Sequence, residues 1–134
     1  MRKLIWDVSF RIGIEQIDKQ HKHLFDISNE LMETQSLTKD EQKVVNALKN
    51  LKEYITTHFN DEESAMRKYN YPLLNDHISK HREIVLSIQE TIKKSATAPV
   101  LKKNLEELLL AWVSNHILKE DIRFSEWSRA NKLL

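Results

Sequence analysis

Apolar side chains recur at intervals of three and four residues along four segments of the chain. This is the period of one face of an α-helix, so each segment is predicted to form an amphipathic helix. The predicted helices span roughly residues 17–34, 38–68, 72–94 and 100–116, and a short helical tail is expected over about 122–132. An N-terminal arm, residues 1–16, lacks this period and carries large apolar side chains that should pack along the helices: Ile5, Trp6, Phe10, Ile12 and Ile14.

The breaks between the segments are short and carry recognisable signals. Thr38-Lys39-Asp40-Glu41 is a capping-box pattern. It predicts a helix start because the Thr hydroxyl can accept a hydrogen bond from an otherwise unpaired backbone N–H. Tyr71-Pro72 predicts the end of the second helix, since proline disfavours a helical residue before it, and residues 95–99 form the last break. Connections this short predict an all-α fold, an antiparallel up-down-up-down four-helix bundle with a non-helical arm and a short C-terminal helix.

The composition fits a single domain over residues 1–134, with only one Gly and two Pro to build hairpins or linkers. The formal net charge is +1, and the chain lacks the basic stripe that binds nucleic acid. The N-terminus lacks a signal-peptide pattern, and no apolar run approaches the roughly 18 residues of a membrane span. We therefore expect a cytoplasmic protein with neither nucleic acid nor a membrane as partner.

Five of the six histidines stand where the apolar stripe of a helix would otherwise carry Leu or Ile. They are His21, His58, His77, His81 and His116. Glu62 takes such a position too, four residues after His58. A buried, ionised carboxylate costs several kcal/mol unless it is paired or bound to metal. Its burial among imidazoles therefore indicates a bound cation. Because the chain has no cysteine, nitrogen and oxygen must hold that cation, which favours iron, manganese, zinc or nickel.

A histidine on an apolar face is, taken alone, usually a hydrogen-bonded core residue rather than a ligand. Residues four apart project from one face of a helix, however, so His58 with Glu62 and His77 with His81 can each converge on a shared centre. His23 follows His21 by two positions and should point into solvent.

Asp121 stands at an awkward spacing, five residues after His116, which places it about 140° round a regular helix. Both side chains can reach one metal site only if the helix loosens between them, as in a π-bulge. We therefore predict an irregularity at roughly residues 117–121.

Four stretches together resemble the hemerythrin family, most closely its single-domain bacterial members. They are residues 13–22 (GIEQIDKQHK), 58–63 (HFNDEE) with Met66 and Tyr71-Pro72, 77–81 (HISKH), and 112–117 (WVSNHI) leading to Asp121. The resemblance runs from about Trp6 to Phe124, and every ligand position of the family motif carries the expected residue type.

The resemblance implies a non-haem di-iron centre with an oxo or hydroxo bridge. One iron would be held by His77, His81 and His116, the other by His21 and His58, and both would share Glu62 and Asp121. Two six-coordinate irons offer about twelve positions. Five imidazoles, two bridging carboxylates and the solvent bridge leave one of them open, on the iron with two histidines. That position is where the family binds O2.

The resemblance also implies an apolar pocket over the open position. Its residues would be Leu24, Phe59, Val113 and Ile117, with Trp112 behind the ligands. A dry, apolar pocket favours a small neutral ligand and slows attack by water-borne anions.

These features favour a non-enzymatic protein for reversible O2 binding, in transport, storage, delivery or sensing. Neutral imidazoles stabilise high-valent iron less than the carboxylates of di-iron oxygenases do, which disfavours O–O cleavage. An enzyme that reduces peroxide or nitric oxide, and iron storage or buffering, are the alternatives. We expect a monomer that binds O2 and small anions such as azide, and a protein that receives O2 is left open as a partner.

Overall fold

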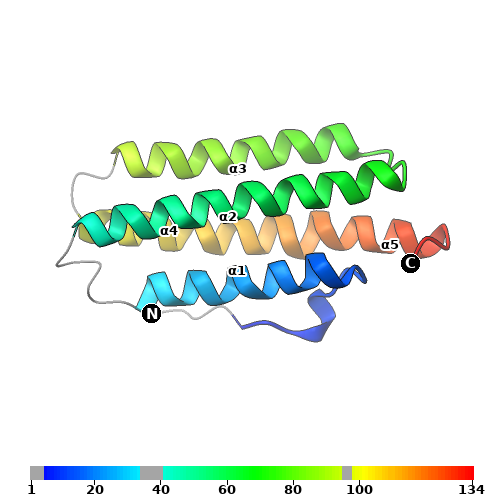
Figure 1. Ribbon diagram of the computed structural model, residues 1–134, viewed down its shortest axis with the longest axis horizontal. Coiled ribbons are helices and arrows are strands. Elements are labelled where there is room, and N and C mark those ends of the chain that lie inside the picture. The colour runs from blue at the N-terminus through cyan, green and yellow to red at the C-terminus, as the bar shows by residue number, and fades with distance from the viewer. Residues whose placement is uncertain (1–4, 34–40, 95–97) are drawn as a thin grey trace.

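The computed structural model describes residues 5–33, 41–94 and 98–134, and the helices of this part of the chain lie side by side along one long axis (Figure 1). The elements in chain order are η1 (Val8–Phe10), α1 (Glu15–Glu33), α2 (Glu41–Lys68), α3 (Leu74–Lys94), α4 (Ala98–Trp112), η3 (Val113–Asp121) and α5 (Ile122–Ala130). No strand occurs within these described ranges. None of the helices found there combines the length and the apolar character needed to cross a membrane.

Successive long helices run in opposite directions, which confirms the predicted antiparallel bundle. In Figure 1, α1 runs from right to left, α2 returns, α3 runs back again, and α4 continues through η3 into α5. The predicted C-terminal tail is therefore present as α5, but it extends the fourth helix instead of standing apart from it.

The boundary between α2 and α3 shows how the local sequence ends a helix. Asn70 takes a left-handed conformation, with φ of 57°. The Tyr71 N–H then donates to the Met66 carbonyl at 2.9 Å, and the Asn70 N–H donates to the Arg67 carbonyl at 3.1 Å. This is the Schellman pattern, which closes a helix by pairing its last carbonyls. Pro72 lies in the following turn, and α3 begins at Leu74, two residues later than predicted.

Other helix ends differ from prediction by a few residues. α1 begins at Glu15, where two acidic residues of its first turn, Glu15 and Asp18, interact favourably with the helix dipole. α4 begins at Ala98 and includes Pro99, which was predicted to belong to the break. A proline is tolerated there because the first N–H groups of a helix have no carbonyl partner. The capping box proposed at Thr38 lies outside the described residues.

The described part of the N-terminal arm packs on the bundle at some of its apolar residues but not at Ile5. The Trp6 ring packs edge-on against Phe25 of α1 at a centroid distance of 5.4 Å, and Ile12 is fully buried. Ile5 is 76% exposed, so its predicted packing is wrong. The arm is also not wholly irregular, because Val8–Phe10 form one 3-10 turn capped by Asp7. Ile5 precedes this turn, and the anchoring contacts of the arm begin at Trp6.

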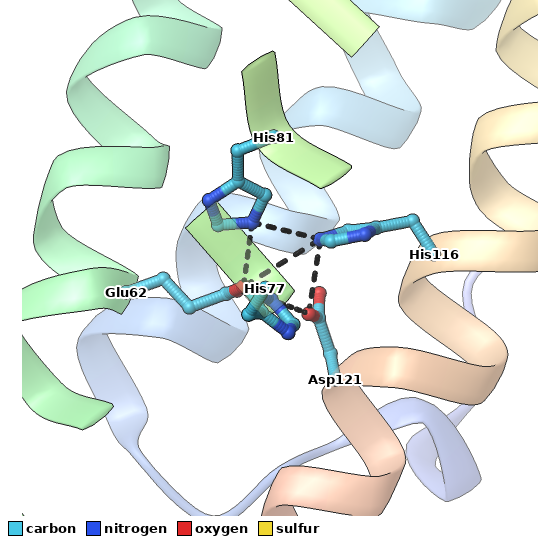
Figure 2. Close-up of side chains that lie close together, drawn as sticks. All are labelled: Glu62, His77, His81, His116 and Asp121. Carbon is cyan, nitrogen blue, oxygen red and sulfur yellow. Dashed lines mark hydrogen bonds and ion pairs between the residues drawn. The ribbon is translucent and has the colours of Figure 1, made fainter. Parts of the chain in front are cut away.

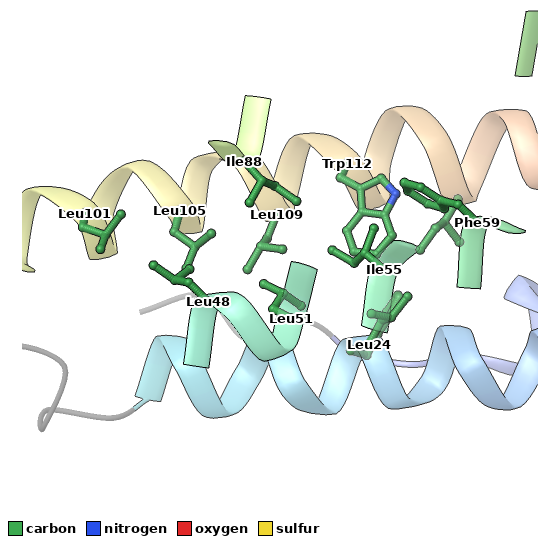
Figure 3. Close-up of a cluster of buried hydrophobic side chains, with 12 residues drawn as sticks. Leu24, Leu48, Leu51, Ile55, Phe59, Ile88, Leu101, Leu105, Leu109 and Trp112 are labelled. Atoms are coloured by element: carbon green, nitrogen blue, oxygen red, sulfur yellow. The ribbon is translucent and has the colours of Figure 1, made fainter. Parts of the chain in front are cut away.

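The apolar core is divided into two clusters. The larger cluster, shown in Figure 3, comprises Leu24, Phe25, Leu48, Leu51, Ile55, Phe59, Ile88, Leu101, Leu105, Leu109, Trp112 and Ile117. The smaller cluster comprises Ile12, Ile17, Met66, Tyr71 and Phe124. Two buried polar residues lie between members of the two clusters: His21 falls between Ile17 and Leu24 on α1, and Glu62 falls between Phe59 and Met66 on α2. The fold thus places a polar layer between two apolar ones.

Candidate metal centre

The polar layer contains all seven residues that the sequence predicts as metal ligands. α1 contributes His21, α2 contributes His58 and Glu62, α3 contributes His77 and His81, and η3 contributes His116 and Asp121. Each of these side chains is at most 4% exposed. Five imidazoles and two carboxylates are therefore withdrawn from water together, and each needs polar partners inside the protein.

The irregular turn predicted before Asp121 is confirmed. Residues Val113–Asp121 form a π-helix, which is longer than the predicted irregularity and begins before His116. In a π-helix, residues five apart approach one face, whereas in an α-helix they diverge. Asp121 is consequently fully buried, and its Oδ1 lies 3.2 Å from Nε2 of His116.

The seven side chains form two groups that share their carboxylates. One group joins Glu62 and Asp121 to His77, His81 and His116, as Figure 2 shows, and the other joins the same carboxylates to His21 and His58. We call the histidines of these groups the three-histidine cluster and the two-histidine cluster. In each group, the possible ligand atoms all lie within 4.8 Å of one another.

Each shared carboxylate directs one oxygen to each cluster. Glu62 Oε1 lies 2.7 Å from Nε2 of His77, while its Oε2 lies 3.2 Å from Nε2 of His21. Asp121 repeats this arrangement, with Oδ1 at 3.0 Å from Nε2 of His77 and Oδ2 at 3.0 Å from Nε2 of His21. Two carboxylates that each span two nitrogen clusters are arranged as bridging ligands of a metal pair would be.

The donor atoms have too few hydrogen-bond partners to satisfy one another. Both oxygens of Asp121 are buried at ion-pair distance from imidazoles, yet neither makes a hydrogen bond, and Nε2 of His58, 3.5 Å from Oε2 of Glu62, has no hydrogen-bond partner either. Nε2 of His81 lies 2.8 Å from Nε2 of His116, so two nitrogens that can both act as metal ligands face each other. Unpaired buried acceptors are rare in folded proteins. This donor set fits metal cations, which would accept all of these lone pairs at once.

The remote ring nitrogens of two histidines are held by hydrogen bonds. Nδ1 of His58 lies 2.8 Å from Oε1 of Gln20, and Nδ1 of His81 lies 2.7 Å from Oε2 of Glu63. An oxygen acceptor at Nδ1 keeps the proton on that nitrogen and leaves the Nε2 lone pair directed into the layer.

Burial and charge have opposite effects on the metal-free histidines. Burial lowers the pKa of His21, but the carboxylates of Asp121 and Glu62 outweigh it and raise the pKa to about 9. The same balance raises the pKa of His77 to about 9 and that of His116 to about 10.

The result differs at His58, and at the two carboxyls each effect acts on the pKa in the opposite direction. Burial dominates at His58 and lowers its pKa to about 4. For the carboxyls of Glu62 and Asp121, burial raises the pKa, but the facing imidazoles outweigh it and hold both values below the usual range. Both carboxylates are therefore ionised in the metal-free protein.

Most of the predicted pocket residues lie in the larger apolar cluster beside this layer. Leu24, Phe59, Trp112 and Ile117 are all buried there. The Phe59 ring stacks on the His81 ring with centroids 3.8 Å apart. The side chain of Val113 lies outside the described part of the structure.

Sequence reasoning missed two residues that contact the histidines. It gave Glu63 no role, whereas the side chain of Glu63 is only 17% exposed and forms a hydrogen bond with His81. It gave Gln20 no role. Spacing could have placed both near the core, though not beside a particular histidine: Glu63 follows Phe59 by four positions, and Gln20 follows Ile17 by three, so each shares a helix face with a core residue. His23 is exposed, as predicted.

Comparison with known proteins supports the same interpretation. Residues 12–127 match the family model described as the hemerythrin HHE cation binding domain. A bacteriohemerythrin of Campylobacter jejuni is 35% identical over 114 residues, which cover 83% of this chain and 84% of that protein. A myohemerythrin of Theromyzon tessulatum is 30% identical over 119 residues, 89% and 88% of the two chains. With its buried histidine–carboxylate layer and a match over most of its length, the chain belongs to the hemerythrin family.

Proposed function

We propose that this protein binds O2 reversibly at two iron ions held in the polar layer of the bundle. The three-histidine cluster would hold one ion, the two-histidine cluster would hold the other, and Glu62 and Asp121 would be shared by both. The observation that carries the proposal is the division of the donors into two clusters of unequal histidine count that share both carboxylates.

The unequal count gives the site a function beyond structure. With a solvent bridge between the metals, the ion at His21 and His58 would lack a sixth ligand, and that position would be open to a small molecule. A site whose purpose is structural has no need of an open position, since structural metal sites close their coordination with protein ligands. Once bound by these residues, an iron pair would supply the two electrons that O2 takes up on binding and returns on release.

The residues around the layer restrict what can reach it. Leu24, Phe59 and Ile117 are buried in the larger apolar cluster, and the Phe59 ring stacks on His81, so apolar side chains form a barrier along this side of the layer. A small neutral ligand passes such a barrier more easily than a hydrated anion does. This selectivity supports reversible binding, because water and anions promote irreversible oxidation of the metal pair.

The proposed physiological setting follows the sequence-based expectation of a cytoplasmic, single-domain protein that transports, stores or senses O2. We propose binding, and not catalysis, as its activity.

The decisive experiment is a visible spectrum of the iron-loaded, reduced protein under N2, under air and with azide. Reversible binding predicts an absorption band that appears under air and disappears when O2 is removed under vacuum, over several cycles. Azide should give a different band in the oxidised protein. Immediate and irreversible oxidation under air would contradict the proposal, as would zinc or manganese in place of iron in protein from iron-replete cells.

A further inference from the structure

The two histidine clusters differ in the side chain that accepts a hydrogen bond from a histidine Nδ1. Nδ1 of His58, in the two-histidine cluster, faces the neutral amide oxygen of Gln20, whereas Nδ1 of His81, in the three-histidine cluster, faces the carboxylate of Glu63. Both contacts are short, at 2.8 and 2.7 Å, and both join neighbouring helices. The acceptor at Nδ1 is thus a neutral amide in the two-histidine cluster and a charged carboxylate in the three-histidine cluster.

A third residue fixes the direction of the Gln20 amide. The Nε2 of Gln20 donates to Oδ2 of Asp61 at 2.8 Å. An ionised carboxylate can only accept hydrogen bonds, so the NH2 end of Gln20 must face Asp61 and its oxygen must face His58. The Nδ1 atom of His58 is then the protonated one, and its Nε2 lone pair is directed into the polar layer. That Nε2 is buried without a hydrogen-bond partner, as a nitrogen reserved for a metal would be.

The difference in charge has a chemical consequence for the metals. A carboxylate that accepts the Nδ1 proton draws it away from the ring and raises the basicity of Nε2, so the imidazole becomes a stronger donor. A neutral amide fixes the ring in the same way but polarises it less. The ligand set of the three-histidine position is therefore made more electron-donating through His81, and that of the two-histidine position is not.

We propose that Glu63 and the Asp61–Gln20 pair make the two metal positions electronically unequal, so that the position proposed to bind O2 keeps the weaker donors. The inference rests on the proposed function only for its physiological meaning. Strong donors stabilise oxidised iron, so a carboxylate behind His58 would slow the release of the ligand and favour permanent oxidation. Gln20, Asp61 and Glu63 act through the histidines and are positioning residues.

The first test moves one negative charge without changing the net charge of the protein. In the double variant Gln20→Glu/Asp61→Asn, the carboxylate shifts from position 61 to position 20, and the amide at position 61 can donate to it. Reduction potentials of the iron-loaded protein should fall for the two-histidine position by about 59 mV, the equivalent of a tenfold change in a one-electron equilibrium. Glu63→Gln should raise the potential of the three-histidine position by a similar amount. Shifts of the same sign, or none, would overturn the inference.

The second test examines the hydrogen bonds of Gln20 directly. In the metal-free protein, nitrogen NMR should find the proton of His58 on Nδ1. The single variant Asp61→Asn removes the lock, because Asn can both donate and accept, and the Gln20 amide is then free to turn round. We expect a mixture of His58 tautomers and roughly tenfold weaker metal binding at the two-histidine position. Gln16→Asn is the control: Gln16 also donates to Asp61, at 3.4 Å, but forms none of the hydrogen bonds to histidines found in the described ranges. An unchanged His58 tautomer in Asp61→Asn would contradict the lock.

The two proposals fail in different ways. If the potentials move in opposite directions but the unmodified protein does not take up O2 reversibly, the proposed function is wrong and the electronic inequality stands. If O2 binding is reversible and the variants keep the original potentials, the inequality is wrong and the proposed function stands.

Discussion

The Oδ1 of Asp121 lies 3.2 Å from Nε2 of His116, although five residues separate them in the sequence. The π-helix Val113–Asp121 makes this approach possible. Since π-helical turns are rare and less favourable than α-helical ones, their presence usually marks a functional site. Here the turn delivers a carboxylate to both histidine clusters at once.

Because Asp121 faces both clusters, its replacement should weaken both metal positions. Asp121→Asn keeps the shape of the side chain but removes the charge and offers one oxygen in place of two. We expect metal affinity to fall by tenfold or more at each position, as measured by competition with a chelator. Glu120→Gln changes the neighbouring carboxylate, which pairs with Lys80 and not with the histidines, and should leave the affinity unchanged. Loss of one metal only in Asp121→Asn would contradict a bridging role.

His58 belongs to one cluster only, so its removal should have an unequal effect. His58→Ala should leave the three-histidine position loaded, bring the metal content to roughly one ion per chain, and abolish O2 binding. Elemental analysis and the spectrum under air measure both outcomes. His23→Ala is the matched control, because His23 is exposed and its ring lies beside that of Tyr54, with centroids 4.7 Å apart, away from the polar layer. Loss of metal in His23→Ala would show that the assignment of histidines to the site is wrong.

The register of the buried residues could be predicted from the sequence because it follows from local periodicity. A His that takes the place of Leu or Ile in an apolar stripe of period 3.6 faces the core. This follows from the periodicity of its own helix and does not depend on which helix packs against it. The spacing of His116 and Asp121 likewise indicated an irregular turn, since regular geometry could not join them. These inferences need only one helix at a time.

What the sequence did not predict depends on contacts between helices or on helix ends. Gln20 and Glu63 bond histidines of other helices, and no spacing within one helix reveals which neighbour a polar side chain meets. Pro99 was assigned to a break because proline usually interrupts a helix, whereas its place in the first turn of α4 depends on where the chain turns. Ile5 was expected to pack because it is apolar, and exposed apolar residues are common.

The raised histidine pKa values predict how the metal-free protein responds to pH. His21, His77 and His116 have pKa values of about 9, 9 and 10, above the ordinary 6.5. A histidine whose pKa is raised by folding contributes its full stabilisation below about pH 6.5. This contribution is lost as the pH rises through about 9 to 10. The melting temperature of the metal-free protein should therefore fall over this range.

The same protons compete with metal. Ligation requires the imidazoles without a proton at Nε2, so loading at pH 7 should release protons and become tighter as the pH rises. A pH indicator in weak buffer detects the release. Metal-free protein that is more stable at pH 10 than at pH 6.5, or loading without proton release, would contradict this electrostatic description.

The pocket assignment predicts a difference between two buried leucines of the same cluster. Leu24 and Leu48 are both buried, but Leu24 lies at the Phe59 end of the cluster and Leu48 lies toward Leu101 (Figure 3). Leu24→Ala and Leu48→Ala should each lower the free energy of unfolding by about 2–5 kcal/mol, since each leaves a cavity in the core. Urea denaturation measures this cost.

Only the cavity beside the polar layer should affect the metals. Leu24→Ala opens space next to His21, where water can enter and hydrogen-bond to the polar groups. Oxidation of the iron-loaded, oxygenated protein under air should therefore be several times faster in Leu24→Ala, while Leu48→Ala keeps the original rate despite a comparable loss of stability. Because the two variants match in residue type, burial and cluster, equal acceleration in both would attribute the oxidation to general loosening of the bundle and would remove Leu24 from the pocket.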